Sequence, residues 1–505
     1  MVTTSSRPEA AAQPLPSEAR RIIGTLLVAA FVVILNETIM GVALPRLMAD
    51  LSVSARTGQW LTTAFMLTMA VVIPTTGFLL QRLSTRTVFV LAMSLFSAGT
   101  LLAAVSPGFW LLLPARIVQA SGTAVMIPLL MTTVLRLVPV ERRGVVMGNI
   151  SIAISVAPAI GPTISGLILQ FLSWRFMFVL VLPIALAALV YGARTLTDIG
   201  EAGNQKLDLL SVVLSVPAFG GIVYGLSQLG QESAAGNSVA IGSLVVGVVC
   251  LLAFGVRQRR LARGDGSPLL DLRPFGYPMF SLGLALLCVA MLSLFGMVIL
   301  LPIYLQTVRG IDALPTGLML LPGGLLMGLL GPTVGKLFDR YGPKALTTSG
   351  ALVLTFTMWQ FSMVDAETSI WLLVGLHVLM SAALACLFTP SFTTALNPLP
   401  PHLYSHGSAI MATLQQVAGA AGTALLVAIM VARTATLTEA GQSEVTALNG
   451  GINTAFAVAS AVSIGAVVLA LFMRSPRPEP PDSAGSANDL DIEERAADRA
   501  VDAQP

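Results

Sequence analysis

Two charged residues lie inside long apolar runs, where an ionised group is costly to bury. Glu37 is the only carboxylate well inside such a run, Phe31–Pro45. An acid in this setting can load and release a proton near neutral pH, so we expect Glu37 to be the proton carrier of a membrane protein. Arg116 lies in another apolar run, and both residues should sit about 10 Å from the same face at 1.5 Å per residue. The pattern predicts that they pair for proton coupling, the alternative being an ion pair that only holds two helices together.

A third titratable residue, His377, lies about 12 Å inside a later apolar run. It would either titrate or bind substrate, or it would be a lone histidine satisfied by a neighbouring hydroxyl or carbonyl group. The three cysteines, Cys250, Cys288 and Cys386, are far apart and lack metal-ligand spacing, which indicates small core residues. We find no phosphate-binding loop, Ser/His/Asp arrangement, zinc spacing or basic nucleic-acid patch. We therefore expect no metal, no cofactor, no enzymatic reaction and no nucleic-acid partner.

The composition places these residues in a membrane protein. The chain has 505 residues, of which 55% are hydrophobic and 10% charged, against about 25% charged residues in soluble domains. Apolar runs of about 20 residues, each long enough to cross a bilayer, recur along it. They predict an all-α integral membrane protein with fourteen transmembrane helices, near residues 22–44, 57–80, 87–106, 110–133, 145–170, 176–193, 208–229, 238–257, 279–304, 315–336, 345–364, 369–390, 405–432 and 452–473.

The distribution of charge in the loops predicts the orientation. Lys and Arg are concentrated in the loops on the same side as the N-terminus, and an even number of spans puts both termini on that side. By the positive-inside rule, both termini are cytoplasmic. Residues 1–20 and 474–505 are poor in apolar residues, so we expect both to be disordered cytoplasmic tails.

Two polar stretches divide the spans. Residues 194–208 and 257–278 flank two of the helices, so we expect a six-helix bundle at 21–193, a linker with two extra helices at 194–278, and a second six-helix bundle at 279–473. A repeat supports duplicated halves: Gly77–Arg86 follows the second span of the first bundle, and Gly335–Lys344 follows the second span of the other.

With these features the chain resembles the major facilitator superfamily, and within it the fourteen-helix drug:proton antiporters of the EmrB/QacA type. It looks closest to the lincomycin-resistance exporters, which share the Asn-x-Thr form of the segment Leu35–Pro45. The resemblance implies the major facilitator fold, two six-helix bundles plus two inserted helices. The family acid of the first helix stands at Asn36 here, and Glu37 lies one residue later, about 100° around the helix.

The repeated loop also matches a family motif. Gly335, Asp339, Arg340 and Gly342 fit it, and the resemblance implies a cytoplasmic charge latch that breaks when the bundles rock. The alternative is that these cations only fix the orientation of the loop. The first copy keeps Arg82 but has Gln81 where the family has Asp and Ser84 where it has Gly, so we expect the stronger latch in the second half.

Two further stretches match motifs of the superfamily. Arg116–Gly122 matches the membrane-embedded Arg motif, apart from Ala120. Pro158, Gly161, Pro162 and Gly166 match the antiporter motif that is typical of exporters in this superfamily, the alternative being an ordinary proline-kinked helix. The resemblance places a substrate cavity between the bundles, for which our candidate lining residues are Asn36, Gln119, Tyr304 and His377.

The sequence therefore predicts proton-coupled export of drugs or other lipophilic small molecules across a bacterial inner membrane by alternating access. The expected partners are the substrate, protons and the lipid bilayer, and the chain should act as a monomer. A Met-rich cavity wall would suit varied substrates, with candidates Met40, Met66, Met126, Met291 and Met297. The alternatives are an exporter of an endogenous lipid, siderophore or self-made antibiotic, a non-transporting receptor, or a membrane enzyme.

Overall fold

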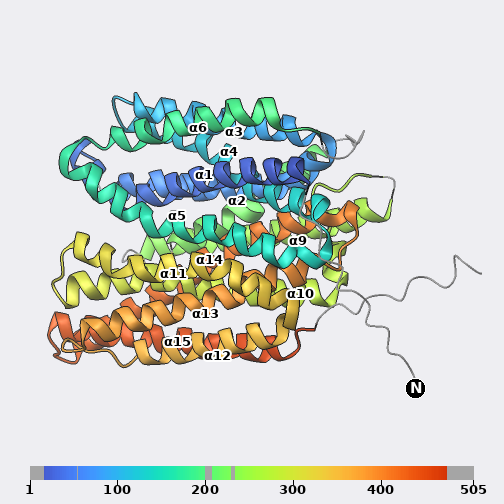
Figure 1. The fold of residues 1–505 in the computed structure, drawn as a ribbon. Helices are drawn as coiled ribbons and strands as arrows, with labels where there is room; N and C mark the ends of the chain where they lie inside the picture. Colours follow the sequence, from blue (N-terminus) through green and yellow to red (C-terminus); the bar gives the residue numbers. More distant parts are fainter. Residues whose placement is uncertain (1–15, 54, 199–207, 229–233, 265, 475–505) are drawn as a thin grey trace, which may run out of the picture. The chain divides into compact units, whose positions relative to one another are not determined.

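The computed structural model describes residues 16–53, 55–198, 208–228, 234–264 and 266–474. The tails expected to be disordered are 1–20 and 474–505; residues 1–15 and 475–505 of them lie outside the described residues, and residues 17–20 instead form the start of the first helix. Every regular element within the described ranges is a helix (Figure 1). The first half holds α1 (Ser17–Asp50), α2 (Ala55–Arg82), α3 (Thr85–Ala104), α4 (Phe109–Leu137), α5 (Arg143–Phe171) and α6 (Arg175–Thr195). The second half holds α10 (Pro278–Ile303), α11 (Ala313–Tyr341), α12 (Pro343–Phe361), α13 (Ile370–Leu396), α14 (Tyr404–Glu439) and α15 (Glu444–Leu471).

Between the halves lie α7 (Leu209–Ser215), α8 (Gly221–Gln228) and α9 (Ala234–Arg263). A π-helical turn at Val216–Gly220 joins α7 and α8 into one span. Within the described residues, 13 helical segments are long and apolar enough to cross a membrane. The remaining predicted span is α12, which exposes Leu352, Phe356 and Trp359 as a lipid-facing helix does. The expected all-helical membrane fold is confirmed.

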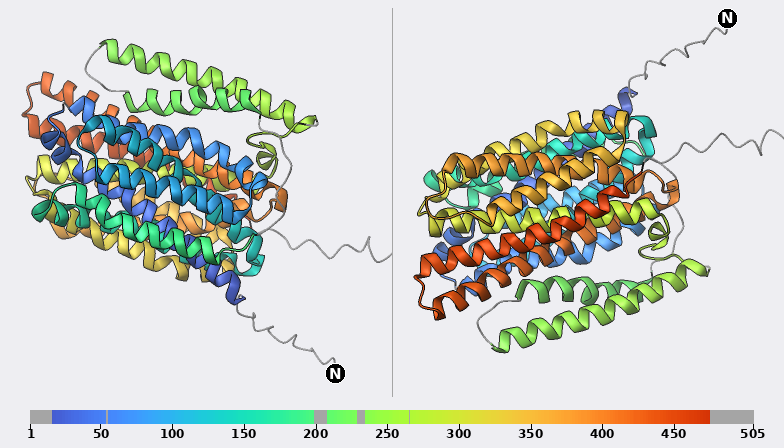
Figure 2. Two further views of the ribbon diagram at one scale, coloured as in Figure 1. Left: turned by 90° about the horizontal axis from the view of Figure 1, so that it is seen from above. Right: turned by 90° about the horizontal axis from the view of Figure 1, so that it is seen from below.

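The helices pack mainly within two groups, as Figure 1 shows. In the first, α3 packs on α4 and α6, and α1 packs on α5. In the second, α13 packs on α11 and α12, and α14 packs on α10 and α15. The main contacts across the groups are α5 with α11 and α2 with α14. The pair formed by α8 and α9 lies at one edge, where α8 contacts α14 and α2 (Figure 2). The domain boundaries at 193/194 and 278/279 remain our proposal.

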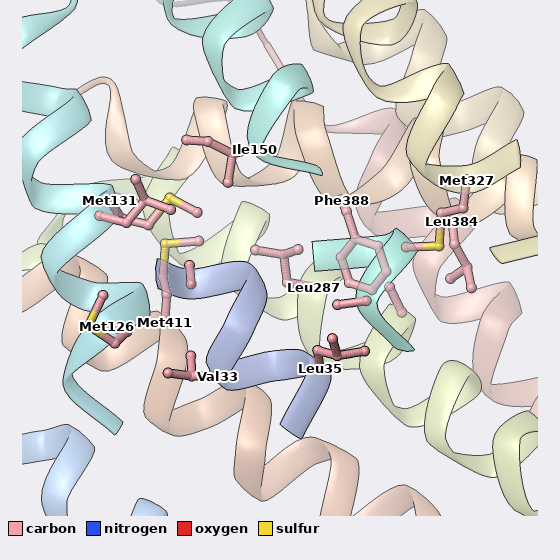
Figure 3. Packing of buried hydrophobic residues seen from close by; sticks show 14 of the residues in the cluster. Val33, Leu35, Met126, Met131, Ile150, Leu287, Met327, Leu384, Phe388 and Met411 are labelled. Atoms are coloured by element: carbon pink, nitrogen blue, oxygen red, sulfur yellow. The ribbon is translucent and has the colours of Figure 1, made fainter. Parts of the chain in front are cut away.

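The centre of the molecule is apolar and rich in methionine. Figure 3 shows Met126 and Met131 of α4 beside Met411 of α14, and Met327 of α11 beside Leu384 of α13; all five are buried. Methionine is flexible and polarisable, so such a core can repack around differently shaped neighbours. Helices of both groups therefore meet over adaptable side chains.

Candidate functional site

A buried arginine organises the polar interior of the first helix group. Arg116 of α4 is 1% exposed, and its Nη1 donates to Asn36 Oδ1 of α1 at 3.3 Å and to Gln119 Oε1 one turn further on. Gln119 Nε2 in turn donates to Thr100 Oγ1 of α3 at 2.7 Å. The guanidinium carbon lies 4.1 Å from the ring centroid of Phe65 on α2. Amide oxygens and an aromatic face thus stabilise a cation among four helices.

Two glycines allow α3 and α4 to approach closely enough for this network. A Cβ at Gly99 would lie 2.7 Å from the Gln119 Cα, and one at Gly122 would lie 2.6 Å from the backbone nitrogen of Phe96. Any larger residue would push the helices apart, because both of these contacts are to backbone atoms. The short distance from Gln119 to Thr100 therefore depends on small residues in both helices.

Glu37 lies next to this network but is not hydrogen-bonded to it. Its side chain is partly buried on α1, and among the described residues no Lys, Arg or His nitrogen lies within 4.0 Å of its carboxylate. Among the described residues no ion pair joins Glu37 directly to Arg116, but the two charges interact electrostatically at longer range, so their pairing stays a prediction. One residue along a helix turns the side chain by about 100°, so Asn36 points at the guanidinium instead. The Nε atom of Arg116 is buried without an acceptor in the described structure.

The predicted antiporter motif packs against the same turn of α1. A Cβ at Gly161 of α5 would lie 3.0 Å from Thr38 Cβ and 3.4 Å from the Ile39 backbone nitrogen. Thr38 Oγ1 is also 3.4 Å from the Ala157 carbonyl oxygen. The glycine thus lets the α5 backbone touch the turn that carries Glu37.

The other members of the motif are placed differently. Pro158 is exposed, and a Cβ at Gly166 would lie 4.0 Å from Cδ1 of Leu314 on α11. The side chain of Pro162 lies outside the described part of the structure. Of the motif residues whose surroundings are described, Gly161 is therefore the one in contact with the Glu37 turn.

The four predicted cavity residues do not form one cluster. Asn36 and Gln119 share the Arg116 network. His377 of α13 places Nε2 3.2 Å from the Leu320 carbonyl oxygen of α11, as the lone-histidine alternative expects, while its Nδ1 is buried and has no hydrogen-bond partner among the described residues. Tyr304 is fully buried and its hydroxyl donates to the Asp365 carbonyl oxygen at 2.5 Å, so it anchors the loop before α13.

Asp339, in the second loop copy, caps a helix of the other group. Its Oδ1 accepts from the Gly144 backbone N–H at 3.1 Å and its Oδ2 from the Val145 N–H at 3.0 Å. These are unpaired donors of the first turn of α5, where a negative charge is favourable. Arg340 instead stacks on Tyr341, with its guanidinium carbon 5.2 Å from the ring centroid.

Gly342 supplies the turn that follows. Its φ of 77° lies in the left-handed region, which a residue with a Cβ adopts at a cost, and it ends α11 just before Pro343 begins α12. The corresponding Ser84 of the first copy has an extended backbone and instead caps α3, accepting from the Thr87 N–H at 3.3 Å. The first copy has therefore changed its local chemistry as well as its acid.

Gln81, the counterpart of Asp339, makes a weaker contact across the groups. Its Nε2 donates to the His402 carbonyl oxygen, before α14, at 2.9 Å. Arg82 lies 5.9 Å from the Phe78 ring centroid on its own helix. A neutral amide on a carbonyl thus replaces a carboxylate on two helix N–H groups.

A stripe of small residues lies between α5 and α11 and was not predicted from the sequence. A Cβ at Gly335 would lie 2.8 Å from the Gly144 carbonyl carbon, and one at Gly148 would lie 2.7 Å from the corresponding atom of Gly331. The recurrence of glycine at intervals of three and four residues was the available signal. The stripe on α11 comprises Gly324, Gly328, Gly331 and Gly335.

Arg143 was also missed, because it was counted only as a loop charge. It is 4% exposed at the start of α5, and its Nη1 donates to Asn397 Oδ1 at 3.1 Å and its Nη2 to the Tyr404 hydroxyl at 3.1 Å. Its Nε and Nη2 also donate to the Val138 and Leu135 carbonyl oxygens at 3.1 and 2.8 Å. One side chain therefore ties the α4–α5 connection to the α13–α14 connection.

Known proteins are similar to this chain in sequence and in fold. The sequence profile of the Major Facilitator Superfamily matches residues 26–423. The chain is 41% identical to the lincomycin resistance protein LmrB of Bacillus subtilis, with 90% of this chain and 95% of that protein covered. It is 40% identical to the uncharacterised MFS-type transporter YcnB of the same organism, with the same coverage. The crystal structure of the human organic anion transporter MFSD10 superposes with a TM-score of 0.64 at 16% identity, over 90% of this chain and 100% of that one.

Proposed function

The chain belongs to the Major Facilitator Superfamily and is a multi-pass membrane transporter, and from this premise we propose that it exports lipophilic small molecules in exchange for protons. The similarity to a lincomycin resistance protein supports a drug-like substrate. The methionine-rich centre supports broad specificity, because flexible side chains adapt to different shapes. In this proposal the membrane is the bacterial inner membrane, both termini are cytoplasmic, and the transporter works as a monomer.

One observation carries the choice of proton site. Glu37 is a partly buried acid without an ion pair, and it lies one residue from Asn36, which accepts a bond from Arg116. The guanidinium has a spare donor, since Nε has no acceptor among the described residues. A deprotonated Glu37 would attract Arg116 away from Asn36, and protonation would release it. Proton loading would therefore rearrange contacts among α1, α3 and α4.

The same rearrangement reaches the antiporter motif. Thr38 follows Glu37 and packs on Gly161 of α5. A shift of this turn of α1 would therefore displace α5 directly. At its other end α5 receives the Asp339 cap and carries Arg143, and both make contacts across the bundles at the loop-motif end. We propose that rocking of the bundles breaks these two contacts and opens the substrate site to the cytoplasm.

The test uses purified protein in proteoliposomes with an imposed pH gradient, with lincomycin and ethidium as transported probes. Dissipating the gradient should abolish concentrative transport by the unaltered protein. Glu37→Gln should lower gradient-driven transport by a factor of about 100 or more, because the proton site is gone. Probe exchange without a gradient should persist, since the altered protein still folds and binds substrate.

Glu439→Gln is the matched control, because Glu439 is an exposed acid at the end of α14 and should transport normally. Undiminished gradient-driven transport by Glu37→Gln would remove Glu37 as the coupling site. Transport of neither probe, with no proton flux in the unaltered protein, would contradict drug:proton exchange and favour an endogenous substrate or a different driving ion.

A further inference from the structure

The segment after the two inserted helices enters the contact between the bundles. Residues 266–277 lead from α9 to α10, and within them Leu269, Leu270 and Asp271 are buried. Asp271 is 1% exposed, which is unusual for an acid in a connecting segment. Its carboxylate accepts from the Arg273 backbone N–H at 2.9 Å and from Arg273 Nε at 2.7 Å. These bonds fold the segment into a local turn.

The turn presents a backbone donor to α14. The Asp271 N–H donates to Nδ1 of His406 at 3.3 Å, and His406 is 2% exposed. The histidine is also packed against α2, since a Cβ at Gly77 would lie 2.6 Å from its Nδ1 and 3.3 Å from its Cα. His406 therefore sits between the first loop motif, which begins at Gly77, and the segment that follows α9.

The electrostatics of the segment agree with this geometry. Burial alone would raise the pKa of Asp271, but hydrogen bonds from the side chain and the backbone of Arg273 hold it below its ordinary value. The acid is therefore charged at neutral pH. The groups around His406 are Asp271 and Arg273 of the segment, Gly77 of α2, and His402 in the turn just before α14.

The same segment is bound to the inserted helices by a second set of contacts. Gln258 of α9 is fully buried; its Oε1 accepts from the Leu270 N–H at 3.2 Å, and its Nε2 donates to Ser211 Oγ of α7 at 2.6 Å. Arg257 and Asp208 add a bidentate ion pair between α9 and the start of α7, with distances of 2.7 and 2.6 Å. These contacts with α7 and α9 therefore fix the position of residues 266–277.

We propose that the two inserted helices hold residues 266–277 as a clasp that keeps α2 and α14 together. The clasp contacts α14 through the hydrogen bond from the Asp271 N–H to His406. The clasp compensates for the first loop motif, in which Gln81 stands in place of the acid and donates a neutral hydrogen bond to the His402 carbonyl oxygen. Opening of the bundles at this end must release His406 from the clasp. This role goes beyond the proposed transport cycle and does not depend on which substrate or ion is carried.

The test measures opening of each bundle contact by thiol labelling, without any transport. In a background with Cys250, Cys288 and Cys386 changed to Ala, Ser408→Cys reports on the side where α14 meets α2 and α4, because Ser408 is 3% exposed and bonded to Thr132 of α4 at 2.9 Å. Ser151→Cys reports on the side where α5 meets α11 and α13: Ser151 contacts Thr389 of α13 at 2.8 Å, and a Cβ at Gly331 of α11 would lie 3.1 Å from the Ser151 Cβ. Labelling uses a membrane-permeant maleimide on the protein in vesicles.

Asp271→Ala removes the turn, and we expect the labelling rate at Ser408→Cys to rise about fivefold or more, the factor that corresponds to one lost hydrogen bond of about 1 kcal/mol. Labelling at Ser151→Cys should not change. His406→Leu should give the same rise, whereas His406→Asn keeps an acceptor in place of Nδ1 and should stay near the parent rate. The double variant Asp271→Ala/His406→Leu should label no faster than either single variant, because both break one contact.

Asp312→Ala is the control, since Asp312 is an exposed acid before α11 with no capping bond from its side chain. Unchanged labelling at Ser408→Cys in both Asp271→Ala and His406→Leu would overturn the clasp. Equal increases at both reporters would also overturn it, because they would indicate general loosening. If Asp271→Ala does not yield folded protein, the contrast between His406→Leu and His406→Asn decides the question alone.

Discussion

The two contacts between the bundles are built in opposite ways. The α5–α11 contact is lined by glycines, so the backbones touch, and a carboxylate from Asp339 closes its end on two N–H groups of α5. The α2–α14 contact places His406 over a single glycine, Gly77, and its Gln81 makes one neutral hydrogen bond. The second contact instead has help from outside the bundles, through the Asp271 segment.

This difference shows that a duplicated fold need not keep duplicated chemistry. Backbone contact through small residues gives van der Waals packing that is lost steeply with any separation. A contact through side chains and a connecting segment can be adjusted by what holds that segment. We therefore expect the α5–α11 side to tolerate substitution poorly and the α2–α14 side to be tunable.

The largest effect is expected from overpacking the glycine stripe. Gly331→Val should lower the melting temperature strongly and abolish transport, because a Cβ there meets the Gly148 carbonyl carbon at 3.2 Å and Ser151 Cβ at 3.1 Å and overpacking costs about 1–3 kcal/mol or more. Thermal unfolding in detergent measures it. Gly317→Val is the control on the same helix, because no atom lies within 4 Å of a Cβ there. Equal melting temperatures of the two variants would contradict a packed stripe.

A smaller effect is expected from the Asp339 charge. Asp339→Asn keeps the shape but removes the charge that favours the N-terminus of α5, a loss of about 1 kcal/mol at this exposed position. Labelling at Ser151→Cys should rise by about fivefold, and transport should fall more than in Gln81→Ala. If Gln81→Ala impaired transport as much as Asp339→Asn, the proposed difference between the α5–α11 and α2–α14 contacts would be contradicted.

Restoring the family acid in the first copy should not restore a latch. Gln81 donates to a carbonyl oxygen, and a carboxylate can only accept, so Gln81→Asp should lose that bond and weaken the α2–α14 contact by about 0.5–1 kcal/mol. We expect labelling at Ser408→Cys to rise about two- to fivefold, the factor that corresponds to this loss. Slower labelling than in the parent would mean that the acid works on both sides and that the asymmetry is only one of sequence.

The smallest effect concerns the ion pair at the base of the inserted helices. The hydrogen bond from Arg257 holds the pKa of Asp208 down at about 2, below about 3.9 in an unfolded chain. The stabilisation by this pair is therefore fully present above about pH 4 and is lost as the pH falls toward 2. The difference in melting temperature between the parent and Asp208→Asn should be constant from pH 7 to 5 and shrink below pH 4. A difference that grows on acidification would contradict this assignment.

The sequence by itself determined the elements and their chemical class. Length and apolarity of a segment decide whether it spans a membrane, because backbone groups in lipid must bond within their own helix. That is why the predicted spans, including α12, correspond to helices of the structure. The same property singled out Glu37 and Arg116, since a charge in an apolar run is visible without any knowledge of neighbours.

Only the tertiary structure decided which groups touch. A shift of one residue turns a side chain by about 100°, so equal depth could not tell whether Asn36 or Glu37 meets Arg116. In the sequence Arg143 looks like an ordinary loop cation, but in the structure it is buried and bonded to Asn397 at the end of α13. Asp271 looks like part of a linker, but in the structure it is buried and its N–H donates to His406. These contacts join residues at least 80 positions apart, and their energies depend on packing between helices rather than on the properties of any one segment.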